Sequence, residues 1–269
     1  MSNAAAGKAF AKVCRSAAVA SARFAMLQPG DRVLAALSGG LDSFVMLETL
    51  LVLARKSPFD FSVQAVTFDP QFPGFNIKGI EDYCRERKIP HTVISMNIDQ
   101  VLKDSPQDRV RRPCVWCSRL RRGHLYKLAR EQKITKLALG HHADDLLESF
   151  FISLVRGQGL TTMGPNVPAD GRNEGDTALR IVRPLALIPE QLVKTAAGYF
   201  EFPTAGSCMY REQLEADGDR AWAGQMLNTI SRRIPDLRSL MLKSLGRVEA
   251  QWLLDERYLD QLKDKPFKL

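Results

Sequence analysis

The sequence predicts an α/β protein, with a doubly wound and mostly parallel sheet followed by a helical C-terminal tail. Three observations predict this fold. Short segments rich in β-branched residues alternate with helical segments at close spacing between residues 31 and 200, the pattern of parallel strands with crossover helices. A glycine-rich loop joins the first expected strand to the first expected helix. The 269 residues, 45% of them hydrophobic, suffice for a sizeable core.

Each element has its own local signal. The segment S-V-Q-A-V-T-F at residues 62–68 alternates as a strand does. The helix before Ile89-Pro90 ends where proline disfavours helical backbone, and the helix that starts at Pro189 has proline in its first turn. Strands are expected at residues 31–37, 62–68, 91–96, 136–140 and 179–187. Helices are expected at residues 42–56, 78–88, 118–133, 144–155 and 189–200, then from 213 to 256 with a break at Ile234-Pro235.

Three segments divide the chain. Residues 1–30 form a basic N-terminal segment without any acid, residues 31–200 form the main domain, and residues 201–269 carry a cysteine-bearing turn and the helical tail. The composition of the first segment is also that of a mitochondrial transit peptide. We favour a basic amphipathic helix packed beside the main domain. Residues 157–176, rich in Gly, Pro, Asn and Asp, predict an exposed loop.

Composition excludes several classes of protein. No apolar run of 18 residues predicts a transmembrane helix. Five cysteines are too few for a disulfide scaffold in a chain of this length, and no secretory signal is visible, so we expect the reducing cytoplasm. The formal net charge of +8 suits a polyanionic partner.

The loop L-S-G-G-L-D-S at residues 37–43 predicts a phosphate site. Gly39 and Gly40 let backbone N–H groups approach an anion, Ser38 and Ser43 add hydroxyl groups, and the next helix directs its positive end there. Asp42 would repel phosphate by itself, but it suits an Mg²⁺ ion carried by the phosphates. The alternative is an ordinary strand–helix turn capped by Asp or Ser.

The string S-G-G-L-D-S resembles the loop of the PP-loop ATP pyrophosphatase superfamily, whose members cleave ATP to AMP and pyrophosphate and have an adenine nucleotide alpha hydrolase-like fold. Three further segments resemble its tRNA 2-thiocytidine synthetase family: F-D-P-Q-F-P-G-F at 68–75, P-C-V-W-C-S-R-L-R-R-G at 113–123, and L-G-H-H-A-D-D at 139–145. Arg183-Pro184-Leu185 continues the match. The resemblance implies ATP contacts by Ser38, Gly39, Gly40, Leu41, Asp42, Ser43, Thr67, Phe68, Gly140, His141 and Asp145.

The cysteine pair Cys114 and Cys117 is half of a metal site, a redox pair, part of an iron–sulfur site, or two packed thiols. The resemblance implies that this pair and Cys208 hold a 4Fe-4S cluster with one open iron, which can bind sulfide. Two features depart from the family: Arg211 stands where a second C-x-x-C would end, and Leu41 replaces a lysine of the loop.

Six arginines and no acid lie between residues 109 and 122. Such a run is usually a solvated face, but this one flanks the cysteine pair. Arginine contacts phosphate with two hydrogen bonds, and Trp116 could stack on an unpaired base or cover the cluster. We therefore expect tRNA contacts from Arg111, Arg112, Trp116, Arg119, Arg121 and Arg122. His141 and His142 precede Asp144 and Asp145, of which one could cap the next helix and the other could aid Mg²⁺.

The resemblance implies the reaction. The C2 oxygen of an anticodon-loop cytidine attacks the α-phosphorus of ATP, pyrophosphate leaves, and sulfur replaces the oxygen to give 2-thiocytidine. Asp42, Cys114, Cys117 and Cys208 would take part in this chemistry, and a cysteine desulfurase or another donor would supply sulfur. Two alternatives stay open: a lysidine synthetase relative that uses lysine as nucleophile, and a non-catalytic metal-containing RNA-binding module. The sequence leaves open a homodimer.

Overall fold

The computed structural model describes residues 3–104, 113–169, 179–203, 206, 218–249 and 252–254, and of residues 102 and 113–115 the backbone alone. The helices are α1 Asn3–Arg23, α2 Leu41–Lys56, α3 Ile77–Glu86, α4 Ile98–Lys103, α6 Pro113–Glu131, α7 Ala143–Val155, α8 Glu190–Ala197, α10 Asp219–Ser231 and α11 Leu237–Leu245. The strands are β1 Arg32–Leu37, β2 Ser62–Asp69, β3 His91–Ser95, β4 Lys136–Ala138, β5 Asn166–Pro168 and β6 Arg180–Val182. Contacts divide the chain into two compact units, Met1–Gln225 and Met226–Leu269.

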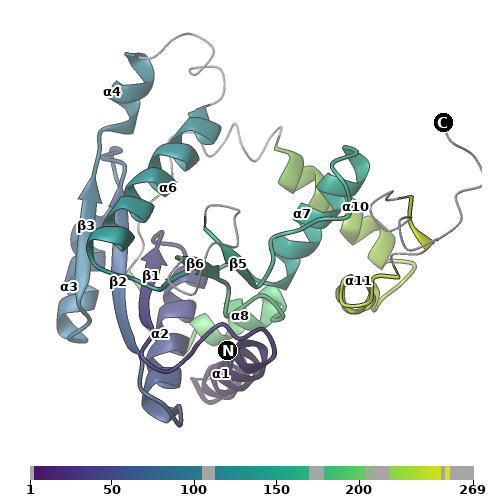
Figure 1. Cartoon of the computed structure of the whole chain (residues 1–269), viewed down its shortest axis with the longest axis horizontal. Coiled ribbons are helices and arrows are strands. Elements are labelled where there is room, and N and C mark those ends of the chain that lie inside the picture. Colours follow the sequence, from purple (N-terminus) through teal and green to yellow (C-terminus); the bar gives the residue numbers. More distant parts are fainter. Residues whose placement is uncertain are drawn as a thin grey trace, which may run out of the picture. The chain divides into compact units, whose positions relative to one another are not determined.

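The sheet of the first unit has the strand order β3-β2-β1-β4-β6-β5. Every neighbouring pair is parallel except β5 and β6, which are antiparallel. The predicted doubly wound, mostly parallel sheet is therefore confirmed (Figure 1). The antiparallel edge strand β5 was not predicted, because it lies inside the segment whose Gly, Pro and Asn residues indicate a loop.

Side chains of alternating direction give the sheet two buried faces. Val33 and Ala35 of β1 pack into a core with α1, α2, α3 and α8, whereas Leu34 packs against Leu125 and Ala129 of α6 on the opposite face. Strands buried on both faces are continuous apolar runs, as residues 33–37 are.

Helix α1 belongs to the first of these cores. Its alanines recur at helical spacing on the buried side, together with Phe10 and Val13. Small side chains let α1 lie close to α2 and α8 (Figure 1). The expected basic amphipathic helix beside the main domain is thus present at residues 3–23.

In the first unit, two boundaries differ from the predictions by five residues, and one helix was not predicted. Strand β6 ends at Val182 rather than Leu187, since Pro184 lacks an N–H for a ladder and the chain then turns through hydrogen bonds from Ala186 N to Arg183 O and from Ile188 N to Leu185 O. Helix α6 begins at Pro113, five residues early, so the C-x-x-C lies on the helix. The short helix α4 was not predicted.

In the second unit, α11 is fastened by Arg238, which donates to Ser231 Oγ (3.0 Å) and Asn228 Oδ1 (2.8 Å). Leu237 is buried there. The predicted helical tail is seen in α10 and α11, with the break at Ile234-Pro235 between them. Helix α11 ends at Leu245, before Gly246, and residues 247–249 are not helical, so the predicted extension of the helix to residue 256 is wrong. The predicted turn at 204–208 lies outside the described residues apart from Gly206.

Candidate nucleotide and RNA-thiolation site

The two signature loops meet where the strand order reverses. Strands β1 and β4 are neighbours, although β2 and β3 lie between them in the sequence. At such a switch point the carboxyl ends of the strands open a crevice that binds ligands in α/β proteins. The loop at 38–43 follows β1 there, and the G-H-H-A-D-D loop at 140–145 follows β4.

Internal hydrogen bonds brace the first loop. Ser38 N donates to Ser43 Oγ (3.3 Å), and Ser43 Oγ donates to Gly40 O (2.7 Å). Gly39 has a φ of 84°, a left-handed conformation that favours glycine. Helix α2 then begins after Gly40 without a side-chain cap. Ser43 N donates to Gly40 O (3.1 Å), and no described side chain caps the helix amides before it, which is the setting of anion sites at helix starts in other proteins.

Gly140 lets the second loop touch the first. A Cβ atom at this position would lie 3.0 Å from Ser43 N and 3.1 Å from both the carbonyl carbon and the oxygen of Asp42. All three are backbone atoms, which cannot rotate away. The contact fixes the distance between the start of α2 and the loop after β4, so any larger residue would spread the two loops.

The H-H-A-D-D residues are held by different partners. Asp145 Oδ2 accepts from His142 N (2.9 Å), and His142 Nδ1 accepts from Asp145 N (3.4 Å), which caps α7. Asp144 Oδ2 accepts from Glu190 N (2.8 Å) and so ties α7 to α8. Arg220 of α10 reaches Asp145 Oδ1 at 3.5 Å. The N-cap residue of α7 is thus His142, with Asp145 completing the capping box from the third helical position, and not one of the two aspartates as the sequence suggested.

Asp42 is a half-buried carboxylate in an acidic setting. Burial raises its pKa, and the carboxylates of Asp145 and Glu190 raise it further, whereas His142 and Lys194 lower it. A bound cation relieves this kind of repulsion. The surroundings of Asp42 therefore fit an Mg²⁺ ion that arrives with a nucleotide.

Thr67 and Phe68 lie at the carboxyl end of β2, beside the first loop, since Thr67 pairs in register with Leu37. The hydroxyl of Thr67 is hydrogen-bonded to His91 Nε2 (2.9 Å). Phe68 packs with Phe72 and Ile98 against the start of α6. Thr67 thus holds β2 to β3 through His91, and Phe68 packs beneath the start of α6, where the cysteine pair lies.

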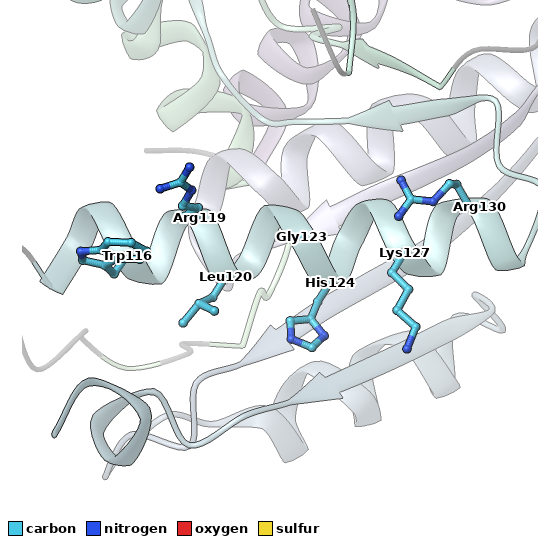
Figure 2. Close-up of a pocket in the computed structure, with 7 residues that line it drawn as sticks. All are labelled: Trp116, Arg119, Leu120, Gly123, His124, Lys127 and Arg130. Atoms are coloured by element: carbon cyan, nitrogen blue, oxygen red, sulfur yellow. The ribbon is translucent and has the colours of Figure 1, made fainter. Parts of the chain in front are cut away.

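One face of α6 carries a basic hollow of about 390 Å³. Figure 2 shows its lining side chains along several turns of the helix: Trp116, Arg119, Leu120, Gly123, His124, Lys127 and Arg130. The guanidinium group of Arg119 lies 5.3 Å from the ring centre of Trp116. Arg121 and Arg122 are exposed on the same helix, while Arg111 and Arg112 lie outside the described residues.

Comparison with known proteins decides the family. A model of the PP-loop domain matches residues 13–200. The tRNA-cytidine(32) 2-sulfurtransferase of Methylococcus capsulatus is 36% identical over 244 residues, which are 90% of this chain and 81% of that protein. The enzyme of the same name from Deinococcus radiodurans is 36% identical over 253 residues, 93% of this chain and 81% of that protein. The chain belongs to the tRNA-cytidine(32) 2-sulfurtransferase family of PP-loop proteins.

A solved structure supports the fold of this family member. The U34-tRNA thiolase NcsA from Methanococcus maripaludis, with its 4Fe-4S cluster, superimposes with a TM-score of 0.62. The match covers 89% of this chain and 80% of that one at 20% identity. In the part of the chain that the structure describes, no helix is long and apolar enough to cross a membrane.

Of the three cysteines expected to hold a cluster, the structure describes the side chain of Cys117 alone. It is half-buried against Phe68, Phe72 and Ile98. Cys114 lies three residues earlier in the first turn of α6, the spacing of two positions on one helix face. Among the described side chains no three metal-binding residues are grouped, and Cys208 lies beyond them.

Gly206, two residues before Cys208, lies beside this region. A Cβ at Gly206 would collide with the carbonyl oxygen of Gly74, so the two backbones touch. Gly74 lies between Phe72 and Phe75, which pack in the same cluster as Cys117. Gly206 therefore contacts the loop that packs against Cys117, and a helix start favours thiolates. These features fit a cluster held by Cys114, Cys117 and Cys208.

Sequence reasoning missed Arg183 as a site residue. It was placed inside a predicted strand, yet it follows β6 and hydrogen-bonds to His141. The signal was a lone charge within the apolar run I-V-R-P-L-A-L-I. Arg220 carried no comparable signal, because its approach to Asp145 depends on the tertiary fold.

Proposed function

We propose that this chain is an ATP-dependent tRNA sulfurtransferase that converts an anticodon-loop cytidine to 2-thiocytidine in the cytoplasm. The observation that carries the proposal is the contact at Gly140, which joins the two signature loops at the switch point of the sheet. Relatives named tRNA-cytidine(32) 2-sulfurtransferase match over nine-tenths of the chain, and they favour sulfur over lysine as the nucleophile.

The first step is formation of an adenylate. ATP would bind at residues 38–43 with its phosphates on the amides of Gly39, Gly40 and the start of α2, and with Mg²⁺ at Asp42. Leu41, Thr67, Phe68, Gly140, His141 and Asp145 would complete the nucleotide site. The C2 oxygen attacks the α-phosphorus, and pyrophosphate leaves. This step turns a poor leaving group on C2 into AMP, with both reactants held in place.

The second step replaces oxygen by sulfur. A sulfur nucleophile at the oxidation level of sulfide, supplied through a cysteine desulfurase or another donor, attacks C2, and AMP leaves with the former C2 oxygen. Cys114, Cys117 and Cys208 would hold a 4Fe-4S cluster, which supplies an iron with an open position for sulfide when it is bound. The half-buried setting of Cys117 would keep bulk water from that position.

The basic face of α6 would hold the RNA. Its start carries the cysteine pair, and its length carries the hollow with Arg119, Lys127 and Arg130 (Figure 2). Trp116 offers an aromatic surface for an unpaired base, and the arginines offer phosphate contacts. Arg111, Arg112, Arg121 and Arg122 would extend the contact. The RNA would thus reach from the α6 surface to the crevice after β1 and β4.

An isotope experiment tests the adenylation step. We expect AMP and pyrophosphate to form from ATP when tRNA is present, and ¹⁸O placed at C2 of the target cytidine to appear in the phosphate of AMP. AMP without the label would refute attack by the C2 oxygen.

A further inference from the structure

Arg183 and His141 meet at the ends of two neighbouring strands. Strand β4 pairs with β6 up to Ala138 and Val182, and Leu139 N donates to Val182 O beyond that pair. Arg183 follows β6 directly, and its Nε donates to His141 Nδ1 at 3.3 Å. His141, which the family resemblance assigns to the nucleotide, thus accepts a hydrogen bond from Arg183.

Arg183 is itself held in place. It is buried, with 7% of its surface exposed. Its backbone N donates to Pro165 O (2.9 Å), and its Nη1 donates to Gly164 O (2.6 Å). Both acceptors belong to the segment before β5, so this edge strand helps to fix the guanidinium group. The bond to His141 therefore comes from a rigid donor.

The chemistry of arginine decides the state of the imidazole. A guanidinium group has five N–H donors and no acceptor, so Nδ1 of His141 must be the bare nitrogen. We infer that Arg183 is a positioning residue that keeps His141 as the neutral tautomer with its proton on Nε2, where it donates to an oxygen of bound ATP. The choice of ATP as acceptor rests on the proposed function, whereas the tautomer rests on the geometry alone.

Electrostatics favours the same neutral form. Burial lowers the pKa of His141 to about 4, and the charges of Arg183 and Arg220 lower it, whereas Asp145 raises it. A second proton would have to sit on Nδ1, facing the Nε–H of Arg183. Nδ1 of His142 also accepts a hydrogen bond, but from the backbone N of Asp145 (3.4 Å), so the tautomer of His142 does not depend on Arg183. A fixed neutral donor of this kind can contact a phosphate oxygen without a proton being moved.

The tautomer can be read directly by NMR. The protein contains four histidines, so ¹⁵N-histidine labelling with long-range ¹H–¹⁵N correlation gives few signals, and His141→Gln assigns the one in question. We expect the pattern of a neutral ring with the proton on Nε2 at pH 7. In Arg183→Met, which keeps an apolar stem but no donor, the two tautomers should mix. A proton on Nδ1 in the wild-type protein would overturn the inference.

Activity gives a second, independent test. A glutamine amide nitrogen reaches roughly as far as Nε2 and an asparagine amide reaches roughly as far as Nδ1, so His141→Gln should exceed His141→Asn by about tenfold or more in kcat for AMP formation. Arg183→Lys keeps one cationic donor group, so its kcat for AMP formation should exceed that of Arg183→Met.

Arg180 supplies the matched control. It lies on β6, three residues before Arg183, and also contacts β5, since its Nε donates to Asn166 Oδ1 at 2.6 Å; its hydrogen bonds go to Asn166 and not to His141. Arg180→Met should leave the His141 tautomer unchanged and kcat within about twofold. Equal losses of kcat in Arg180→Met and Arg183→Met, with an unchanged tautomer in both, would mean that Arg183 only stabilises the fold and does not position His141. No AMP formation by the wild-type protein, with the Nε2 tautomer present, would overturn ATP as the acceptor.

Discussion

Replacement of Gly140 by alanine should separate the two loops of the nucleotide site. The added Cβ would lie 3.0–3.1 Å from three backbone atoms of Asp42 and Ser43, whereas ordinary contacts begin at 3.4 Å. The loops must therefore move apart by about 0.3–0.4 Å. Overpacking of this kind costs about 1–3 kcal/mol of folding stability. In a protein of this size, that lowers Tm by about 2–12 °C.

The effect on catalysis should exceed the effect on the fold. A misplacement of about 1 Å can cost about a hundredfold in rate, so a third of that displacement predicts a loss of about fivefold in kcat/KM for tRNA-dependent AMP formation. The assay is AMP release below the melting temperature, compared with ATP affinity. Gly198→Ala is the control, because its Cβ would meet Thr195 O at 3.5 Å, an ordinary contact. A Gly140→Ala protein with unchanged kcat/KM would refute the close meeting of these loops as a catalytic requirement.

Three further predictions concern the site and its support. Asp42→Asn should keep Tm but lose most AMP and pyrophosphate release, because the proposed Mg²⁺ ligand is weakened; near-wild-type ATP cleavage with tRNA would remove that role from Asp42. Arg119→Ala with Arg122→Ala should flatten the log–log salt dependence of tRNA binding by about 0.7–0.9 per lost phosphate contact, measured by titration against Arg55→Ala with Lys56→Ala as the charge control; an unchanged slope would mean a solvated face. Burial lowers the pKa of His91 below its ordinary value of 6.5, so its contribution to stability is complete above about pH 6.5 and is lost as the pH falls through the lowered pKa. Urea titrations at pH 7 and 5 should show a smaller pH effect in His91→Gln than in the wild-type protein, and an equal effect would contradict this role.

Most strands of the sheet could be predicted from the sequence, because the patterns that indicate them lie within each strand. The buried run at β1, the alternation in β2 and the loop glycines each depend on neighbouring residues, and β1, α2, β2 and β3 were placed to within one residue. The placement of the loops after β1 and β4 at one edge of the sheet also followed, since carboxyl ends of parallel strands share that edge, but their contact at Gly140 did not.

The remainder depends on contacts between distant segments. Strand β5 has three residues, including Pro168, and exists because Arg180 and Val182 pair with it. The Arg183–His141 bond needs β6 to lie beside β4, and no spacing in the sequence states that order. The early start of α6 follows from Pro113 as first helical residue, whereas the helix was expected from residue 118.

The most direct test of the account is the content of 2-thiocytidine in tRNA after an anaerobic reaction with ATP and a sulfur donor. Nuclease digestion and mass spectrometry would measure the nucleoside, alongside iron and sulfide in the protein. The account predicts 2-thiocytidine with the wild-type chain and none without ATP. In Cys208→Ala, it predicts loss of iron and of product but retention of ATP binding, since residues 38–43 form a separate loop. Thiolation without ATP, or full iron content and full thiolation in Cys208→Ala, would contradict it.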